Sequence, residues 1–171
     1  MIRKATTNDI ADIMGIVSDA QLSLRDLGID QWQDGYPSID VIKDDIASEV
    51  GYVYCVDNEV AGYAAIVLTG EEAYNQISAN RWNTTNDYVV VHRLCVKRNY
   101  TKAGIATALM TFASNIAVRG GYTGFRIDTH RGNIRMLAML EKLGFSYVGV
   151  IYYDSGERLA YDLKLNNSIL M

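Results

Sequence analysis

The chain has 171 residues, of which 49% are hydrophobic and 21% charged, and its formal net charge is −4. This length and composition predict one globular domain spanning residues 1–171, with a sizeable core and no disordered tract. The acidic balance, with a sequence pI near 5.1, argues against general nucleic-acid binding, which normally needs a basic surface.

The sequence carries no pattern typical of a signal peptide, a membrane-spanning segment or a metal site. The N-terminus lacks the apolar core of a signal peptide, and no apolar run is long enough to cross a bilayer. We therefore expect a cytoplasmic protein that does not bind membranes. Cys55 and Cys95 fall in strand-like runs without metal-ligand spacing, so they are predicted to be reduced core residues rather than metal ligands or a disulfide framework.

The first part of the chain carries alternating strand and helix signals. Thr6 and Asp9 resemble a capping box ahead of a helical apolar pattern that begins at Ile10. Asp57-Asn-Glu between two strand-like runs is a hairpin signal. The predicted elements are a strand at 2–5, a helix from 10 to about 24, an aromatic and polar loop at 27–37, a helix at 39–48, and strands at 50–56 and 60–68.

The second part begins with residues 69–87, a polar and aperiodic segment that is long for a connection; such loops often cover a site. The predicted elements that follow are a strand at 88–97, a helix from 105 that ends near Gly120-Gly121, a strand at 124–129, a helix at 133–143, and strands at 145–153 and 158–164. This order predicts an α/β chain with one central crossover and antiparallel hairpins outside it.

The strand, turn and helix between residues 88 and 115 form the most informative stretch. Its turn carries Lys97, Arg98 and Lys102, and Gly104 stands where the helix is about to begin. Unpaired N–H groups and the helix dipole favour an anion at a helix N-terminus. The turn therefore predicts a phosphate-binding site.

Charge patterning supports an anionic ligand. Although the chain has 20 acidic residues, none lies between Tyr88 and Ile127. That window holds Arg93, Lys97, Arg98, Lys102, Arg119 and Arg126. A local positive field in an acidic protein indicates an anion held at one place. The alternative is that the lack of acidic residues reflects chance together with two buried elements, since buried strands and helices carry few charges in any protein.

Two motifs resemble the GCN5-related N-acetyltransferase (GNAT) family. The first is Leu94-Cys-Val96 followed by Thr101-Lys-Ala-Gly-Ile-Ala106, and the second is Asn133-Ile-Arg-Met136 leading into Leu140-Glu-Lys-Leu-Gly-Phe145. The resemblance extends in element order over nearly the whole length. It implies an N-acetyltransferase domain at 1–171 with a mixed, mostly antiparallel central sheet flanked by helices. Within that sheet, the strands at 88–97 and 124–129 would form a splayed parallel pair.

The chain departs from the family pattern at two positions. Thr101 stands where the family usually has Arg or Gln before the glycine turn, and Leu140 stands where a frequent tyrosine often serves as the acid for the leaving thiolate. The first departure removes one side-chain donor to a pyrophosphate. The second leaves the identity of the general acid open, with Tyr152 and Tyr153 as possible substitutes.

The resemblance implies acetyl-CoA as donor, CoA as product, and an amine as acceptor. Main-chain groups of Leu94, Cys95 and Val96 would pair with the pantetheine arm as an added strand would. An N–H at the end of that strand would polarise the thioester carbonyl. Asn133 would offer its amide near the thiol end. The pyrophosphate would lie on N–H groups of the turn and first helical residues, namely Lys102, Ala103, Gly104, Ile105, Ala106 and Thr107. Thr101 would also belong to the cofactor site.

An amine must lose a proton before it attacks, so a base is useful. His92 and His130 are the only histidines, and both lie in or beside predicted central strands. Asp128 and His130 share one face by strand alternation and would serve as orienter and base. The alternatives are a half-buried strand histidine for His92 and a cap for the helix near Asn133 for the Asp128–His130 pair.

The acceptor side is less defined. By resemblance, the loop with Trp32 and Tyr36 borders the acceptor, and an aromatic pair can line a pocket or hold a cation. The alternative is a packed loop anchor.

Three functions follow from these features. The first is direct transfer of an acetyl group to a primary amine of a small molecule or peptide through a tetrahedral intermediate, with a homodimer as one expected assembly. The second is a non-catalytic acyl-CoA-binding or sensing module. The third, a nucleotide binder, is disfavoured because the turn lacks the Gly-Lys-Ser/Thr ending and the three-glycine dinucleotide fingerprint.

Overall fold

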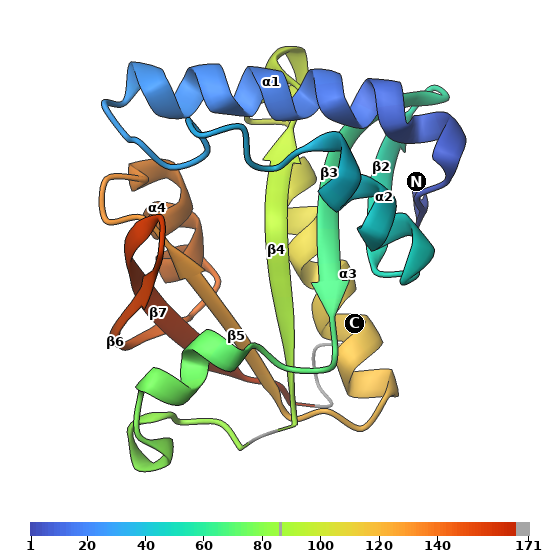
Figure 1. Cartoon of the computed structure of the whole chain (residues 1–171). Helices are drawn as coiled ribbons and strands as arrows, with labels where there is room; N and C mark the ends of the chain where they lie inside the picture. The colour runs from blue at the N-terminus through green and yellow to red at the C-terminus, as the bar shows by residue number, and fades with distance from the viewer. Residues whose placement is uncertain (86, 167–171) are drawn as a thin grey trace. The chain divides into compact units, whose positions relative to one another are not determined.

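The computed structural model of the chain describes residues 1–85 and 87–166. Seven strands form one sheet in the order β1-β2-β3-β4-β5-β7-β6 (Figure 1). β4 and β5 pair in parallel, whereas β1–β2, β2–β3, β5–β7 and β6–β7 pair antiparallel. The strands are β1 (Ile2–Lys4), β2 (Gly51–Val56), β3 (Glu59–Val67), β4 (Tyr88–Val96), β5 (Gly124–Thr129), β6 (Ser146–Tyr153) and β7 (Gly156–Lys164).

The helices also follow the predicted order. The α-helices are α1 (Ile10–Asp26), α2 (Ile39–Ala47), α3 (Ile105–Arg119) and α4 (Ile134–Lys142). Short 3₁₀ helices are η1 (Thr7–Asp9), η2 (Glu72–Gln76), η3 (Ala79–Arg81) and η4 (Arg98–Tyr100). The mixed sheet with its parallel β4–β5 pair flanked by helices confirms the predicted fold class. The described residues gather into two compact units, residues 1–66 with 91–112, and residues 67–90 with the chain from 113 onward.

In the first unit, side-chain alternation along β3 assigns the helices to opposite faces of the strands. The buried Tyr63 belongs to a core with Ile13 and Ile16 of α1 and Ile42 of α2. Its neighbour Gly62 points the other way, where an added Cβ would lie 2.7 Å from the Ile105 side chain of α3. Only a glycine lets α3 approach β3 this closely.

The hairpin between β2 and β3 matches its sequence signal. Asp57 and Asn58 have φ values of 47° and 68°. Two successive positive φ angles are typical of the two-residue type I′ turn, whose twist suits antiparallel strands. Aspartate and asparagine tolerate this conformation better than most residues do, which explains why these residue types occur here.

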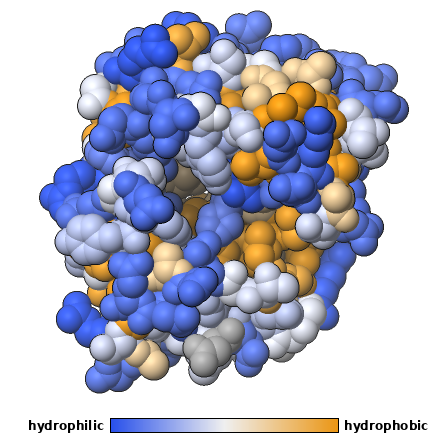
Figure 2. All heavy atoms as spheres, in the orientation of Figure 1, coloured by the Kyte–Doolittle hydropathy of each residue, from blue (hydrophilic) through white to orange (hydrophobic). Residues whose placement is uncertain are grey.

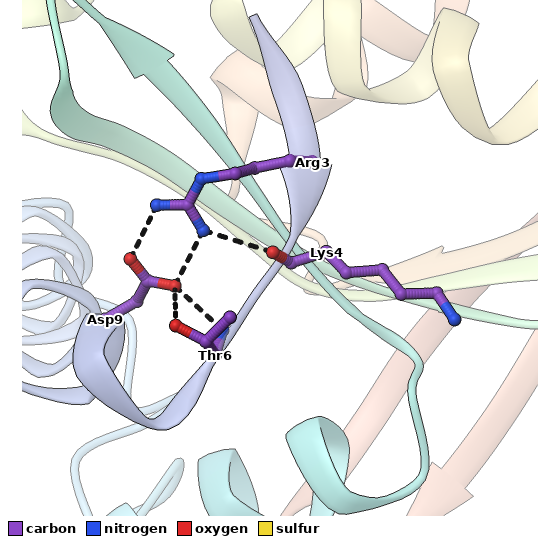
Figure 3. Close-up of polar contacts among 4 residues, drawn as sticks. All are labelled: Arg3, Lys4, Thr6 and Asp9. Atoms are coloured by element: carbon purple, nitrogen blue, oxygen red, sulfur yellow. Dashed lines mark hydrogen bonds and ion pairs between the residues drawn. The ribbon is translucent and has the colours of Figure 1, made fainter.

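A charged cluster fixes the N-terminus to the start of α1 (Figure 3). Asp9 accepts hydrogen bonds from both terminal nitrogens of Arg3, at 2.7 and 2.8 Å. It also accepts from the Thr6 N–H at 2.7 Å and the Thr6 hydroxyl at 2.9 Å. The Arg3 hydrogen bonds hold the pKa of Asp9 at about 2. The capping box predicted at Thr6 and Asp9 is therefore present, with the turn η1 between the cap and α1.

In the second unit, residues 69–87 are more ordered than the sequence predicts, because η2 and η3 lie within them; Asn86 falls outside the described residues. Buried Asp162 of β7 accepts from the Asn83 N–H at 2.6 Å and the Thr84 N–H at 3.1 Å. Arg126 of β5 lies 4.1 Å from the Trp82 ring centroid and 4.0 Å from that of Tyr88. This segment is thus attached to the strands by buried polar and aromatic contacts.

The two cysteines are free and buried, with Cys55 8% and Cys95 5% exposed. Burial raises the pKa of the Cys95 thiol to about 12. Hydrophilic side chains cover most of the face shown in Figure 2, and hydrophobic ones gather in separate patches. No helix in the described ranges is both long and apolar enough to span a membrane. No cluster of three or more metal-ligating side chains occurs among those residues either.

Candidate active site

The turn between β4 and α3 is held together by its own hydrogen bonds. The Thr101 hydroxyl donates to the Arg98 carbonyl at 2.8 Å, and the Thr101 N–H donates to the same oxygen at 3.3 Å. The Ala103 N–H donates to the Tyr100 carbonyl at 3.1 Å. Thr101 and Ala103 therefore shape the turn, and their N–H groups point back into it.

The residues that follow present N–H groups in a different way. Lys102 and Gly104 have φ values of 69° and 79°, whereas Ala103 between them does not have a positive φ. When successive residues alternate between positive and negative φ, their N–H groups turn toward one side of the chain and form an anion-binding concavity. The first helical bond runs from the Ala108 N–H to the Gly104 carbonyl at 2.9 Å. The N–H groups of Ile105, Ala106 and Thr107 come before this first bond in the chain, so they have no carbonyl acceptor within the helix.

Gly104 faces open space, because a Cβ built there would meet no atom within 4 Å. Its positive φ, rather than crowding, explains the glycine. The space beside it is available to a ligand that approaches the main chain.

The positive charge of this region is concentrated in fewer side chains than the sequence suggests. Arg93 is paired with Asp45, and Lys97 is paired with Glu59. Arg126 is 4% exposed and stacked as described above. Of the four basic residues between 93 and 102, Arg98 and Lys102 keep exposed side chains, so these two carry the field at the turn.

The proposed acceptor-side aromatics have different environments. Trp32, with a φ of 65°, packs partly buried against the core of the first unit. Tyr36 is 38% exposed and accepts a hydrogen bond from Arg93 at 2.7 Å. The two rings meet edge to face with centroids 6.4 Å apart. Trp32 thus anchors the loop, while Tyr36 offers an exposed ring.

In the second unit, Asp128 near the end of β5 is the centre of a polar cluster. Its Oδ2 accepts from the Tyr74 hydroxyl at 2.9 Å and from the Tyr153 hydroxyl at 3.1 Å. Tyr74 is 1% exposed, and burial, together with the Asp128 charge, raises its pKa well above the usual value. Tyr153 is only half-buried. Of these two tyrosines, Tyr153 is the one that keeps exposed surface.

His130 and Asn133 lie in the turn between β5 and α4. His130 Nδ1 accepts from the Gly132 N–H at 2.9 Å, so the proton of a neutral ring lies on Nε2. The Asn133 side chain accepts from the Met136 N–H at 3.3 Å and caps α4. Its amide NH₂ remains a donor. The helix cap is therefore Asn133 itself rather than Asp128 or His130.

The two remaining positions are also located. His92 is half-buried in β4, next to Arg93. Leu140 is fully buried in α4, so the position of the family's usual tyrosine belongs to the core in this chain. Any general acid must come from elsewhere.

Sequence reasoning missed Tyr74 and the role of Arg93. Tyr74 lies in the segment that looked aperiodic, and no local signal marks it. Arg93 did carry a signal, because a charged residue inside a run of strand-forming hydrophobics needs a buried partner.

The comparisons agree with this architecture. The model of the acetyltransferase (GNAT) family matches residues 20–145. A GNAT-family acetyltransferase from Streptococcus agalactiae 2603 is 34% identical, with a TM-score of 0.83 over 98% of this chain and 95% of that one. A GNAT-family acetyltransferase from Listeria monocytogenes 4b F2365 is 19% identical, with a TM-score of 0.74 over 96% and 94%.

A third solved structure, a ribosomal-protein-alanine N-acetyltransferase from Brucella melitensis, shares the fold at 16% identity, with a TM-score of 0.69 over 96% of this chain and 99% of that one. A search of curated protein sequences finds no match. The family match covers most of the chain, and the first structural relative is more than 30% identical. The chain belongs to the GNAT acetyltransferase family.

Proposed function

We propose that this protein is a single-domain N-acetyltransferase that moves an acetyl group from acetyl-CoA to a primary amine of a small molecule or peptide. The observation that carries the proposal is the backbone of residues 102–107. Lys102 and Gly104 have positive φ angles, a Cβ built at Gly104 would meet no atom within 4 Å, and the first helical hydrogen bond starts only at the Ala108 N–H; such a helix start suits a diphosphate.

The residues present fit the cofactor. Lys102 and Arg98 supply exposed positive charge beside the N–H groups, and the main chain of Leu94–Val96 offers a strand edge to the amides of the pantetheine arm. Thr101 takes part only by shaping the turn. Asn133, in the second unit, stays a prediction as a ligand of the cofactor near its thiol end.

Acetyl-CoA, when bound, supplies an activated thioester carbonyl. An amine nitrogen would attack that carbonyl carbon directly, and the bond from carbon to sulfur would break to leave the thiolate of CoA. The amine proton goes to a base, and the thiolate takes up a proton. The task of this chain is to stabilise charge on the carbonyl oxygen through an N–H of β4 and to move those two protons.

Asp128 and Tyr153 are our candidates for proton handling, with Tyr74 as a buried hydrogen-bond partner. A phenol bonded to a carboxylate can protonate a leaving thiolate and be restored from solvent. His130 and His92 stay predictions as bases. In the neutral tautomer that the Gly132 contact selects, His130 Nε2 is a donor rather than an acceptor. Trp32 and Tyr36 are proposed to border the acceptor.

The alternative is a non-catalytic acyl-CoA-binding module, which Thr101 and the buried Leu140 favour. Acetyl-CoA with a panel of primary amines and peptides distinguishes the two by release of free thiol. We expect turnover with at least one amine. Tight CoA binding without any turnover would support the binding module. A cytoplasmic location and a homodimer stay predictions.

The assignment of the turn is tested with Gly104→Glu, which places bulk and negative charge where the diphosphate is proposed to lie. We expect isothermal titration with CoA to give no measurable binding. Gly121→Glu is the matched control, because Gly121 also has a positive φ of 81° and open space around it. Its affinity for CoA should equal that of the parent. Unchanged affinity in Gly104→Glu would refute the site.

A further inference from the structure

Arg93 is unusual in both backbone and side chain. It lies inside β4 between His92 and Leu94, yet its φ is 55°. A residue with a long side chain adopts this left-handed conformation at a cost in free energy, and it persists only where other contacts impose it. The position follows directly on His92 and precedes Leu94–Val96, the proposed cofactor-binding end of the strand.

The side chain supplies those contacts. Arg93 Nε and Nη2 donate to the two carboxylate oxygens of Asp45 in α2, at 2.8 and 2.6 Å. The side chains are only 12% and 8% exposed. Tyr63 of β3 also donates to Asp45, at 2.6 Å. This bidentate, shielded pair is the strong kind of charge-assisted hydrogen bond, and it fixes the guanidinium in one orientation.

The third nitrogen of the guanidinium reaches a different element. Arg93 Nη1 donates to the Tyr36 hydroxyl at 2.7 Å, and the Tyr36 ring meets the edge of Trp32. One planar group therefore joins the end of β4, helix α2 and the loop at 27–37. Because the guanidinium is planar and rigid, a rotation of the backbone at residue 93 moves all three contacts together.

We propose that Arg93 is a positioning residue that couples the acceptor-side loop at 27–37 to the cofactor-binding end of β4. Binding of CoA at Leu94–Val96 would then change the positions of Tyr36 and Trp32. The coupling rests on the proposed function, since it needs CoA at that strand. Neither a sequence motif nor the charge pattern marks this link, which is defined by the contacts of the Arg93 side chain with Asp45 and Tyr36.

A role confined to stability makes a different prediction. If the Arg93–Asp45 pair only held the fold together, loss of the Tyr36 contact would leave cofactor sensing and the acceptor KM unchanged. Tyr36→Phe removes a single hydroxyl and keeps the aromatic ring, so it separates the coupling from the buried ion pair. Arg93→Lys keeps the charge and removes the planar fork.

The test uses the full chain labelled with fluorotryptophan. Trp32 and Trp82 are the two tryptophans, so each gives one fluorine NMR signal, and Trp82 serves as reference. In the parent, we expect CoA to shift the Trp32 signal. In Tyr36→Phe, CoA should bind within about twofold of the parent affinity, while the CoA-induced shift of the Trp32 signal falls by more than about half. The KM for the best amine of the panel should rise about three- to tenfold, with kcat unchanged.

Arg93→Lys should weaken CoA binding about fivefold or more and abolish the Trp32 response. The matched control is Arg3→Lys, which breaks another bidentate pair, Arg3–Asp9 (Figure 3), in the same unit; it should bind CoA and shift the Trp32 signal as the parent does. Thermal melting shows whether each variant is folded, and Tyr36→Phe decides the matter if Arg93→Lys is not.

The outcomes separate the two proposals. CoA binding with no shift of the Trp32 signal in the parent, or with the same shift in Tyr36→Phe, would overturn the coupling and leave the acetyltransferase proposal intact. Failure of the parent to bind CoA would overturn both.

Discussion

At the residue scale, Asp128 illustrates how one carboxylate can have two roles. It accepts from a fully buried phenol, Tyr74, and a half-buried one, Tyr153. The buried partner can only orient the carboxylate, because nothing from solvent reaches it. The half-buried partner is the one that we propose to exchange its proton with a ligand. The different roles proposed for Tyr74 and Tyr153 therefore follow from their different burial.

This arrangement gives a prediction for Tyr153→Phe. Loss of the phenolic proton donor should lower kcat by on the order of 10²-fold, while CoA affinity stays within about twofold because the ring remains. Steady-state thiol release and calorimetry measure the two quantities. Tyr152→Phe is the control, since Tyr152 is 61% exposed, and it should retain parent activity.

His130→Asn tests the competing base. Asparagine keeps a side-chain oxygen for the Gly132 N–H but removes the imidazole. If Asp128 takes the amine proton, the loss of kcat is smaller than about tenfold. A loss of about 10²-fold or more in this variant would instead assign the role of base to His130.

At the element scale, the Arg3–Asp9 cluster links β1 to the start of α1. The pKa of Asp9 is lowered from 3.8 to about 2, first by its hydrogen bonds to Arg3. A carboxylate with a lowered pKa in the folded state stabilises the fold above pH 3.8, and this contribution is lost as the pH falls through about 2.

Asp9→Asn should therefore lower the free energy of unfolding by about 1–2 kcal/mol at neutral pH, a figure reduced because Arg3 is partly exposed. Urea denaturation across a pH series measures it. The difference from the parent should shrink as the pH falls below about 4. Asp40→Asn, at an exposed ion pair with Lys43, should change stability little at any pH. A pH-independent loss in Asp9→Asn would refute the ionic explanation.

Elements were predictable where the signal is local. The helical spacing from Ile10 to Leu24 and the Asp57-Asn58 turn define α1 and the β2–β3 hairpin without any knowledge of the rest. The segment at 69–87 was not predictable, because its order depends on Arg126 and Asp162 in distant strands. The partner of Asp128 was hidden for the same reason, since Tyr74 lies 54 residues away in the sequence.

At the scale of the whole molecule, the net charge of the chain and the local charge at the β4–α3 turn have opposite effects on a phosphorylated ligand. The chain carries a net charge of −4, which repels a phosphorylated ligand at long range. The exposed Arg98 and Lys102 at the turn attract it at short range. Salt screens exposed charges over about 10 Å at moderate ionic strength, so the balance can be read from the dependence of affinity on salt.

We expect CoA to bind at least about threefold more weakly when salt rises from about 0.05 M to about 0.5 M, because the local attraction dominates. Pantetheine, which lacks the phosphates, should show no such change. Calorimetry of both ligands at the two salt concentrations measures this. If CoA affinity rose with salt, long-range repulsion would dominate, and the turn would not be the phosphate site.

The burial of both sulfur atoms has a practical consequence. Because Cys55 and Cys95 are shielded and the Cys95 thiolate is disfavoured at neutral pH, the folded protein should react slowly with disulfide reagents. A colorimetric reading of released coenzyme would then have almost no background from the catalyst. On denaturation, the same reagent would titrate two groups per chain, so one chemical reports both turnover and the integrity of the sample.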